Sequence, residues 1–332
     1  MTVVPEPISR VVVTGATGFI GTHLLRRLSR ERLPVLAVVR QTPTTSAADS
    51  NLTYVERDME RVETIRDLLR PGDAIVHLAA RVHVMKDDDP DSEAAYRRSN
   101  VEPTRMLCRS AAESGARRVV YLSSAKVFGE GRDRPYERSD PPAPADAYAR
   151  SKIEAEHVVR EVAGAGGVQW TIVRPPFVYG PGGKGNFPRL VALARISTKV
   201  PLPLGSITNR RSVVFVGNLV DLLARCALDA RAAGQLVLPS DAREVSTPEL
   251  LQAIAKARAS RALLFPFPPS LLRAAAAVVG RSAEMDRLTE SLRLDVRHLR
   301  EVLEWEPPFT LEHAMQRSVG TGGVVGAEVG HG

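Results

Sequence analysis

The sequence has only two cysteines, Cys108 and Cys226, which lie far apart in the 332-residue chain. Without a Cys-x-x-Cys pair, a disulfide scaffold and a zinc site are both excluded, and we expect no metal in the functional site. The chain also lacks the run of about 18 apolar residues that a membrane helix needs, and its first residues lack the pattern of a signal peptide. We therefore expect a cytoplasmic protein without a membrane partner.

Aromatic residues make up only 5% of the chain, and none is interleaved with a basic cluster. A net charge of +7 arises from 45 Lys and Arg against 38 Asp and Glu, with the arginines spread along the whole chain. This pattern favours a negatively charged small ligand over nucleic acid. The length and the ordinary globular composition leave room for about two domains.

Short apolar runs alternate with helical patterns through the N-terminal half of the chain. Buried strands separated by helices indicate βαβ units on a parallel sheet, so the predicted fold class is α/β, a doubly wound Rossmann-type sheet. The expected strands lie at residues 10–14, 35–39, 52–55, 74–79, 119–122 and 171–173, and the first expected helix at 19–28.

From Pro175 onward, frequent proline and glycine break the chain into loops and short elements. We expect a Rossmann domain at 1–174, a smaller, mostly helical substrate domain at 175–317 and a disordered tail at 318–332, with a segment near 210–230 returning to the first domain. Expected helices span 247–257, opened by Ser246 as N-cap and by Pro248, then 269–279 and 295–303. The apolar stretch 271–279 is expected to be core or pocket wall rather than a membrane contact.

A glycine-rich turn, Thr14-Gly15-Ala16-Thr17-Gly18-Phe19-Ile20-Gly21, joins the first predicted strand to the first predicted helix. Gly15 permits a tight turn, Gly18 lets the backbone approach a phosphate, and Gly21 lets the helix pack closely on the sheet. The amides of a helix N-terminus bind a pyrophosphate well. At this junction the spacing Gly-x-x-Gly-x-x-Gly predicts a dinucleotide site.

The residue after the second strand bears on which dinucleotide binds. An acidic residue there suits the ribose hydroxyls of NAD, whereas an arginine suits the 2′-phosphate of NADP. The residue is Arg40, so NADP(H) is favoured and NAD(H) remains open. Asp58, after the third strand, is a candidate to accept a hydrogen bond from the adenine amino group.

Tyr148 and Lys152 are four residues apart, on one face of a predicted helix. A lysine in that position can stabilise the phenolate and lower the pKa of the tyrosine from about 10 toward neutrality. Ser123 and Ser124 end the fifth strand at the carboxyl edge of the sheet, where such sheets bind ligands. Spacing alone does not separate the two serines.

Five motifs in order resemble the extended short-chain dehydrogenase/reductase family, and more narrowly its nucleotide-sugar epimerases, dehydratases and 4-keto-reductases: TGATGFIG at 14–21, HLAA at 77–80, SSAKVFG at 123–129, YARSK at 148–152 and RPPFVYGPG at 174–182. The resemblance implies that Ser124 binds the reacting oxygen, Tyr148 exchanges its proton and Lys152 also holds the nicotinamide ribose. It further implies cofactor contacts from Thr17, Phe19, Ile20, Leu78, Ala79, Ala80 and Pro175.

The resemblance also nominates residues around the substrate. Asn100 matches a catalytic asparagine, although Pro103 stands where the family usually has glycine. Arg211 matches an arginine that contacts the nucleotide diphosphate, and Lys184 and Asn186 either touch phosphates or close a turn. Lys126, a candidate substrate contact, stands where 4,6-dehydratases carry an acidic pair, which argues against dehydration.

We therefore predict an NAD(P)-dependent oxidoreductase of a nucleoside-diphosphate sugar that reduces a 4-keto-sugar. The alternative is an NAD-dependent 4-epimerase, and the remaining hypotheses are a reductase of a non-sugar ketone and a non-catalytic dinucleotide sensor. Arg40 favours the reductase over the epimerase, because it suits an exchangeable NADPH. Assembly into a homodimer is one further possibility that the sequence leaves open.

Overall fold

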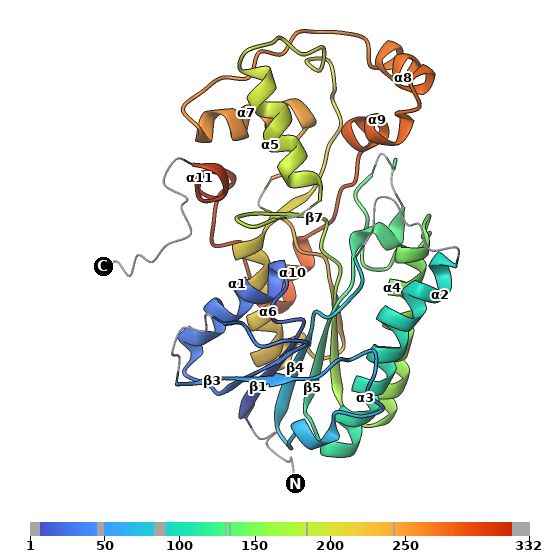
Figure 1. Ribbon diagram of the computed structural model, residues 1–332, viewed down its shortest axis with the longest axis vertical. Coiled ribbons are helices and arrows are strands. Elements are labelled where there is room, and N and C mark those ends of the chain that lie inside the picture. Colours follow the sequence, from blue (N-terminus) through green and yellow to red (C-terminus); the bar gives the residue numbers. More distant parts are fainter. Residues whose placement is uncertain are drawn as a thin grey trace.

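A parallel sheet covered by helices forms the lower lobe of the computed structural model, and short helices form the upper lobe (Figure 1). The structure describes residues 7–44, 50–82, 91–129, 131–132, 134–183, 185–241 and 243–320, so Lys184 and most of the predicted tail lie outside the described residues. This architecture confirms the predicted doubly wound α/β fold with a smaller helical part. No described helix combines the length and apolarity that crossing a bilayer requires.

The main sheet has seven parallel strands in the order β3-β2-β1-β4-β5-β6-β9. Their bounds are β1 Arg10–Thr14, β2 Val35–Val39, β3 Leu52–Glu56, β4 Asp73–His77, β5 Arg118–Leu122, β6 Gln169–Val173 and β9 Gln235–Val237. All six predicted strands are present, and β9 is an additional edge strand. The order of the strands reverses between β1 and β4, because β2 and β3 lie on one side of β1 whereas β4, β5 and β6 lie on the other. Sheets of this type bind ligands at that point.

Alternate residues of each strand enter the cores on the two faces of the sheet, as the two-residue period of a strand requires. On one face Val11 and Val13 pack with α1 Phe19–Leu28 and α6 Val216–Leu228, and α10 Arg297–Leu303 and α11 Leu311–Val319 join the same core. On the other face Val12 packs among residues of α3 Glu102–Ser114 and α4 Ala147–Val158, which follow α2 Ser92–Tyr96. Helix α11 contains residues 318 and 319, which are the first two residues of the predicted disordered tail.

The upper lobe contains α5 Asn186–Ser197, α7 Thr247–Ala257, α8 Pro269–Val278 and α9 Ser282–Thr289, with a two-stranded parallel sheet of β7 Phe177–Tyr179 and β8 Val213–Phe215 beneath them. Ser246 caps α7 and forms a capping box with Glu249, as the sequence predicts. The expectation that 271–279 is core holds only for Ala276, which is buried, and Leu272, which is half-buried against the core. Leu271, Val278 and Val279 are exposed instead, and the alternative of a pocket wall stays a prediction.

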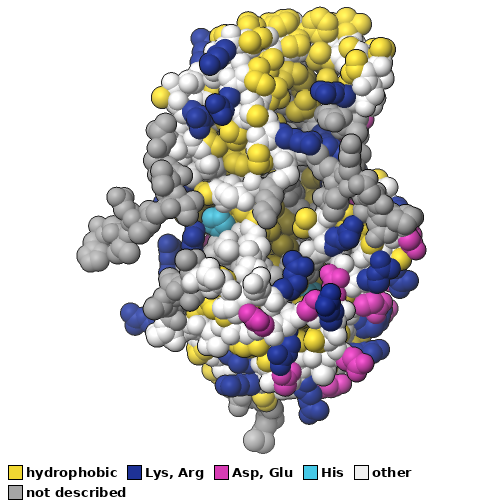
Figure 2. Space-filling model, viewed as in Figure 1, with side chains coloured by type: hydrophobic (Ala, Val, Ile, Leu, Met, Phe, Trp, Pro, Cys, Tyr) yellow, Lys and Arg dark blue, Asp and Glu magenta, His cyan; other side chains and the backbone are white. Residues whose placement is uncertain are grey.

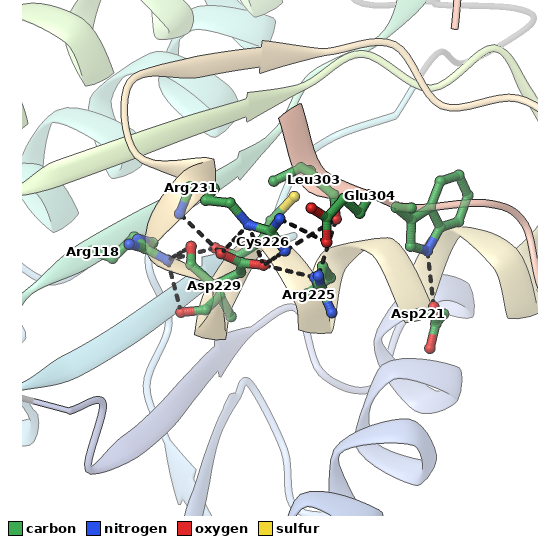
Figure 3. A network of polar contacts seen from close by, with 10 residues as sticks. Arg118, Asp221, Arg225, Cys226, Asp229, Arg231, Leu303 and Glu304 are labelled. Atoms are coloured by element: carbon green, nitrogen blue, oxygen red, sulfur yellow. Dashed lines mark hydrogen bonds and ion pairs between the residues drawn. The ribbon is translucent and has the colours of Figure 1, made fainter. Parts of the chain in front are cut away.

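A buried arginine joins β5 to the end of α6 (Figure 3). The Arg118 guanidinium is 1% exposed and donates hydrogen bonds to the carbonyls of Cys226, Ala227 and Asp229. These carbonyls lie in the last turn of α6, where a cation is favoured by the helix dipole. Arg231 continues the network by binding the Asp229 carboxylate at 2.9 Å.

Candidate active site

The glycine loop between β1 and α1 is packed too tightly for side chains. Gly15 has a φ of +67°, and a Cβ there would lie 2.6 Å from the backbone nitrogen of Ala79. A Cβ on Gly21 would lie 2.4 Å from the carbonyl oxygen of Gly15. Strand β4 and helix α1 therefore both approach the loop backbone directly, as the roles predicted for these glycines require.

Helix α1 begins at this loop without a side-chain cap, since its N-cap is Gly18. The first amides of a helix have no partner within the helix, so those of Phe19, Ile20 and Gly21 can bind an anion. Thr17 and Gly18 are exposed beside them. An uncapped helix start next to an open backbone turn fits the pyrophosphate of a dinucleotide.

The end of β4 is tied to β1 by a chain of polar contacts. The Thr14 hydroxyl lies 2.6 Å from Nδ1 of His77 and accepts a hydrogen bond from the Ala79 amide at 3.3 Å. Burial lowers the pKa of His77 to about 3, so its ring is neutral and serves as a structural link. Leu78, Ala79 and Ala80 remain half-exposed at the edge of the sheet beside the glycine loop.

Arg40 and Asp58 lie at the same sheet edge, after β2 and β3. The parallel register pairs Val39 with Glu56, so the two predicted cofactor residues follow neighbouring strand ends. Arg40 is exposed, whereas Asp58 is half-buried and pairs with Arg61 at 3.2 Å. Asp58 thus already has a cationic partner that the sequence did not suggest.

Tyr148 and Ser124 meet at the carboxyl edge of the sheet, where their hydroxyl groups are hydrogen-bonded. Ser124 follows β5 and accepts a hydrogen bond from the Lys126 amide at 3.2 Å, and Tyr148 lies in the first turn of α4, which Asp146 caps. Burial raises the pKa of Tyr148 to about 12, although the bond from Ser124 lowers it. The prediction that its pKa falls toward neutrality is therefore wrong for the ligand-free protein.

The position of Lys152 explains why the pKa of Tyr148 is not lowered toward neutrality. Its ammonium is 3% exposed and donates a hydrogen bond to the Leu122 carbonyl at 2.9 Å, while it lies 6.0 Å from the centre of the Tyr148 ring. Burial lowers the pKa of Lys152 to about 7, and Glu156 opposes the shift. Lys152 is thus beside the phenol but is held by the end of β5 rather than by the phenol oxygen.

The structure separates the two serines that spacing left equivalent. The Ser123 hydroxyl is buried and donates to Glu156 Oε1 at 2.6 Å, so Ser124 and not Ser123 is the serine bonded to Tyr148. Arg174 binds the same carboxylate through two hydrogen bonds of 2.8 and 2.6 Å. Sequence reasoning missed this buried pair, although Glu156 stands four residues after Lys152 and faces the same side of α4.

Asn100 lies in a π-helical turn, Arg97–Val101, just before α3. Its amide accepts from the Arg81 amide at 2.8 Å and donates to the Arg81 carbonyl and to the Ser151 hydroxyl at 3.1 and 3.0 Å. Pro103 is accommodated in the first turn of α3, where proline is favoured. Asn100 therefore joins the loop after β4 to α4, the helix that carries Tyr148.

The predicted substrate residues fall in three places. Lys126 lies near Tyr148, with its ammonium 3.4 Å from the Asp146 carboxylate. Asn186 begins α5, and Arg211 donates to the carbonyls of Arg287 and Glu290 at 3.1 and 3.0 Å. The Pro175 carbonyl accepts a hydrogen bond from the Ala125 amide at 2.8 Å. The start of the β6–β7 connection therefore lies next to the residue that follows Ser124.

Comparisons with known proteins agree with this geometry. The NAD dependent epimerase/dehydratase family matches residues 11–237. A UDP-glucose 4-epimerase of Vibrio cholerae is 36% identical over 312 residues, which cover 93% of this chain and 94% of that protein. A dTDP-4-dehydrorhamnose reductase of Mycobacterium tuberculosis is 32% identical over 181 residues, covering 53% and 52%.

Among solved structures, MoeE5 in complex with UDP-glucuronic acid and NAD superposes with a TM-score of 0.74 at 25% identity, covering 93% of this chain and 97% of that one. The fold is consistent with these matches. The chain therefore belongs to the NAD-dependent epimerase/dehydratase family, and it is an enzyme of the extended short-chain dehydrogenase/reductase type that uses a nicotinamide dinucleotide.

Proposed function

We propose that this enzyme is a 4-epimerase of a uridine-diphosphate sugar. The observation that carries the proposal is the hydrogen-bonded pair of Ser124 and Tyr148, with Lys152 on the same helix, beside the dinucleotide loop. The relative named as a UDP-glucose 4-epimerase matches over nine-tenths of both chains, whereas the reductase relative matches over about half. The alternative interpretation of the sequence thus has more support than the 4-keto-reductase, which we keep as the second candidate.

In this proposal Tyr148 moves the proton of the sugar C4 hydroxyl. With a pKa of about 12 the phenol is protonated before ligands bind, so removal of a proton requires added positive charge nearby. The Lys152 ammonium provides part of it, and Ser124 holds the sugar oxygen by a hydrogen bond. A bound nicotinamide dinucleotide supplies the hydride acceptor for the sugar carbon and, after the sugar turns, the donor. Tyr148 then returns the proton to the same oxygen.

The remaining predicted residues have supporting roles. Asn100 acts as a positioning residue, because its amide contacts Arg81 and Ser151 rather than the reacting hydroxyls. Lys126 is close enough to Asp146 and Ser124 to reach a sugar substituent. Arg211 donates to two carbonyls at the end of α9, and we keep the prediction that its guanidinium contacts the diphosphate.

The preference between the two dinucleotides stays a prediction. Arg40 is exposed after β2 and can pair with a 2′-phosphate, which favours NADP(H). MoeE5, in contrast, was solved with NAD, and an epimerase keeps one cofactor through its whole cycle. The 4-epimerase proposal does not depend on which dinucleotide Arg40 selects.

The test is incubation of the purified enzyme with UDP-glucose or UDP-galactose, with and without added NADPH. Interconversion of the two sugars without a net change in nicotinamide absorbance supports the 4-epimerase. Stoichiometric oxidation of NADPH by a nucleotide-linked 4-keto-sugar, without interconversion, assigns the reductase instead. Tyr148→Phe is the control, and turnover of simple ketones alone would refute both candidates.

A further inference from the structure

The upper lobe carries nearly all of the large hydrophobic side chains that the described residues expose. Seven of the eight lie in residues 187–205 and 255–282, and the other is Val82 near the sheet edge. The seven, which we call the apolar cap, are Ile196, Val200, Leu263, Phe265, Leu271, Val278 and Val279. Figure 2 shows hydrophobic side chains gathered over this end of the molecule.

Backbone pairing joins the two segments of the cap. The Leu202 amide donates to the Leu263 carbonyl at 2.9 Å, and the Phe265 amide donates back to the Leu202 carbonyl at 3.0 Å. The Leu263 amide in turn binds the Ser197 carbonyl at the end of α5 at 2.7 Å. Ile196 and Val200 therefore lie next to Leu263 and Phe265, and α8 follows within four residues.

Helix α8 has no protein layer over its outer side. Val278 is 87% exposed and Val279 67% exposed, and Leu271 is also exposed. Pro269 at the start and a run of alanines favour a helix here, and α8 is held through Ala276, Leu272 and the bonds of Arg273 to Thr289 on α9. A contiguous exposed apolar surface of this kind marks an interaction site.

Basic residues predominate in the two segments that carry the cap. Residues 187–205 and 255–282 contain eight Lys and Arg and no Asp or Glu. Lys199, Arg261 and Arg281 are exposed and form no ion pair with any described side chain. Acidic residues follow these segments in the sequence at Glu284, Asp286 and Glu290, and Asp286 and Glu290 line a cavity of about 420 Å³ with Arg132 and Arg273.

We propose that the apolar cap and its basic rim dock the enzyme on the surface of an anionic lipid bilayer. Apolar side chains of a surface helix enter the boundary between headgroups and acyl chains, and Lys and Arg bind the anionic headgroups. A second copy of this chain would bring the two basic rims together, so charge favours the bilayer over self-association. The inference is independent of the catalytic proposal, and it concerns surface contact, not a membrane span.

The test is sedimentation of the full-length enzyme with phosphatidylcholine vesicles and with vesicles that also contain phosphatidylglycerol. We expect binding to the anionic vesicles, weakened by high salt. Arg261→Gln with Arg281→Gln should weaken binding about 25-fold, at about fivefold for each charge. Val278→Asp with Val279→Asp should weaken it at least about tenfold, while turnover of soluble nucleotide sugar and the circular dichroism spectrum stay unchanged.

Matched controls lie outside the cap. Val82→Asp changes an equally exposed valine, and Arg297→Gln with Arg300→Gln removes two exposed charges from the lower lobe, so both should bind vesicles like the wild type. Absence of binding to anionic vesicles, equal binding to neutral ones, or equal loss in the controls would overturn the proposal. Self-association that the Val278 and Val279 changes abolish, without vesicle binding, would assign the cap to a second copy.

Discussion

Replacement of Lys152 by methionine should separate the stability of this enzyme from its activity. The Lys152 side chain is 3% exposed, and burial lowers its pKa from 10.5 to about 7. The unfolded chain keeps the ordinary value, so between the two values the unfolded state binds more protons than the folded state. The stability of the wild-type protein therefore rises with pH across this window, and below it the full cost of burying the ammonium is present.

The lowered pKa of Lys152 sets an upper limit on the change in the free energy of unfolding. The difference between 10.5 and about 7 corresponds to at most about 5 kcal/mol. Methionine removes this cost but leaves the Leu122 carbonyl without the hydrogen bond of Lys152, a loss of about 1–3 kcal/mol. We expect Lys152→Met to be more stable than the wild type by about 1–3 kcal/mol near neutral pH, and the difference to shrink or reverse toward pH about 10. Its kcat should fall at least about 100-fold.

Urea unfolding followed by circular dichroism measures both proteins, freed of bound dinucleotide, in steps from about pH 6 to about pH 10. Lys256→Met, which changes an exposed lysine, is the control and should show no such pH dependence. A difference between wild type and Lys152→Met that is the same at every pH would refute the lowered pKa. Turnover by folded Lys152→Met at the wild-type rate would refute its role in the reaction.

Five further substitutions test the site and the fold. Tyr148→Phe should fold normally and lose at least about 100-fold in kcat, checked by steady-state kinetics. Ser124→Ala should lower kcat. Ser123→Ala removes a buried hydrogen bond to Glu156, so it should lower the urea midpoint more than kcat. The reverse pattern would show that the roles of the two serines are misassigned. Arg118→Met should destabilise by about 2–4 kcal/mol in urea unfolding, because three buried carbonyls lose their donor. Arg40→Asp should shift preference toward NAD(H) by about 1–3 kcal/mol in calorimetric titrations with NADPH and NADH, and an unchanged ratio would place Arg40 outside the ribose site.

The parts of the fold that depend on local pattern could be predicted from the sequence. Runs such as Val11–Val13 are buried on both faces of a parallel sheet, and they are followed by turn glycines and amphipathic helices, so strand and helix positions agree closely with the structure. Ser246 and Pro248 likewise marked the start of α7. Strand β9 was missed, because three residues at a sheet edge give almost no periodic signal.

Exposure of an apolar helix could not be predicted in this way. The sequence 269–279 has the composition of a core helix, and only the placement of neighbouring elements shows that Leu271, Val278 and Val279 stay exposed while Leu272 and Ala276 are covered. The hydrophobicity of a side chain gives the free-energy cost of its exposure to water. It does not show which surface covers the side chain. For the exposed side of α8 we propose that this surface is a bilayer, which the vesicle experiment tests.

In the candidate active site, the sequence motif likewise predicts which side chains are neighbours, whereas their surroundings set their pKa values. The Tyr148–Lys152 spacing places both groups on one face of α4, but the pKa values depend on burial and on where each proton donor points. Lys152 donates to the Leu122 carbonyl, and Glu156 is shared with Ser123 and Arg174, so these pairings belong to the tertiary structure. An unliganded phenol with a raised pKa and an ammonium with a lowered one both favour the forms that need no added charge. A charged ligand bound beside them is expected to change both pKa values, and a comparison of the pH dependence of unfolding with and without bound dinucleotide would show this.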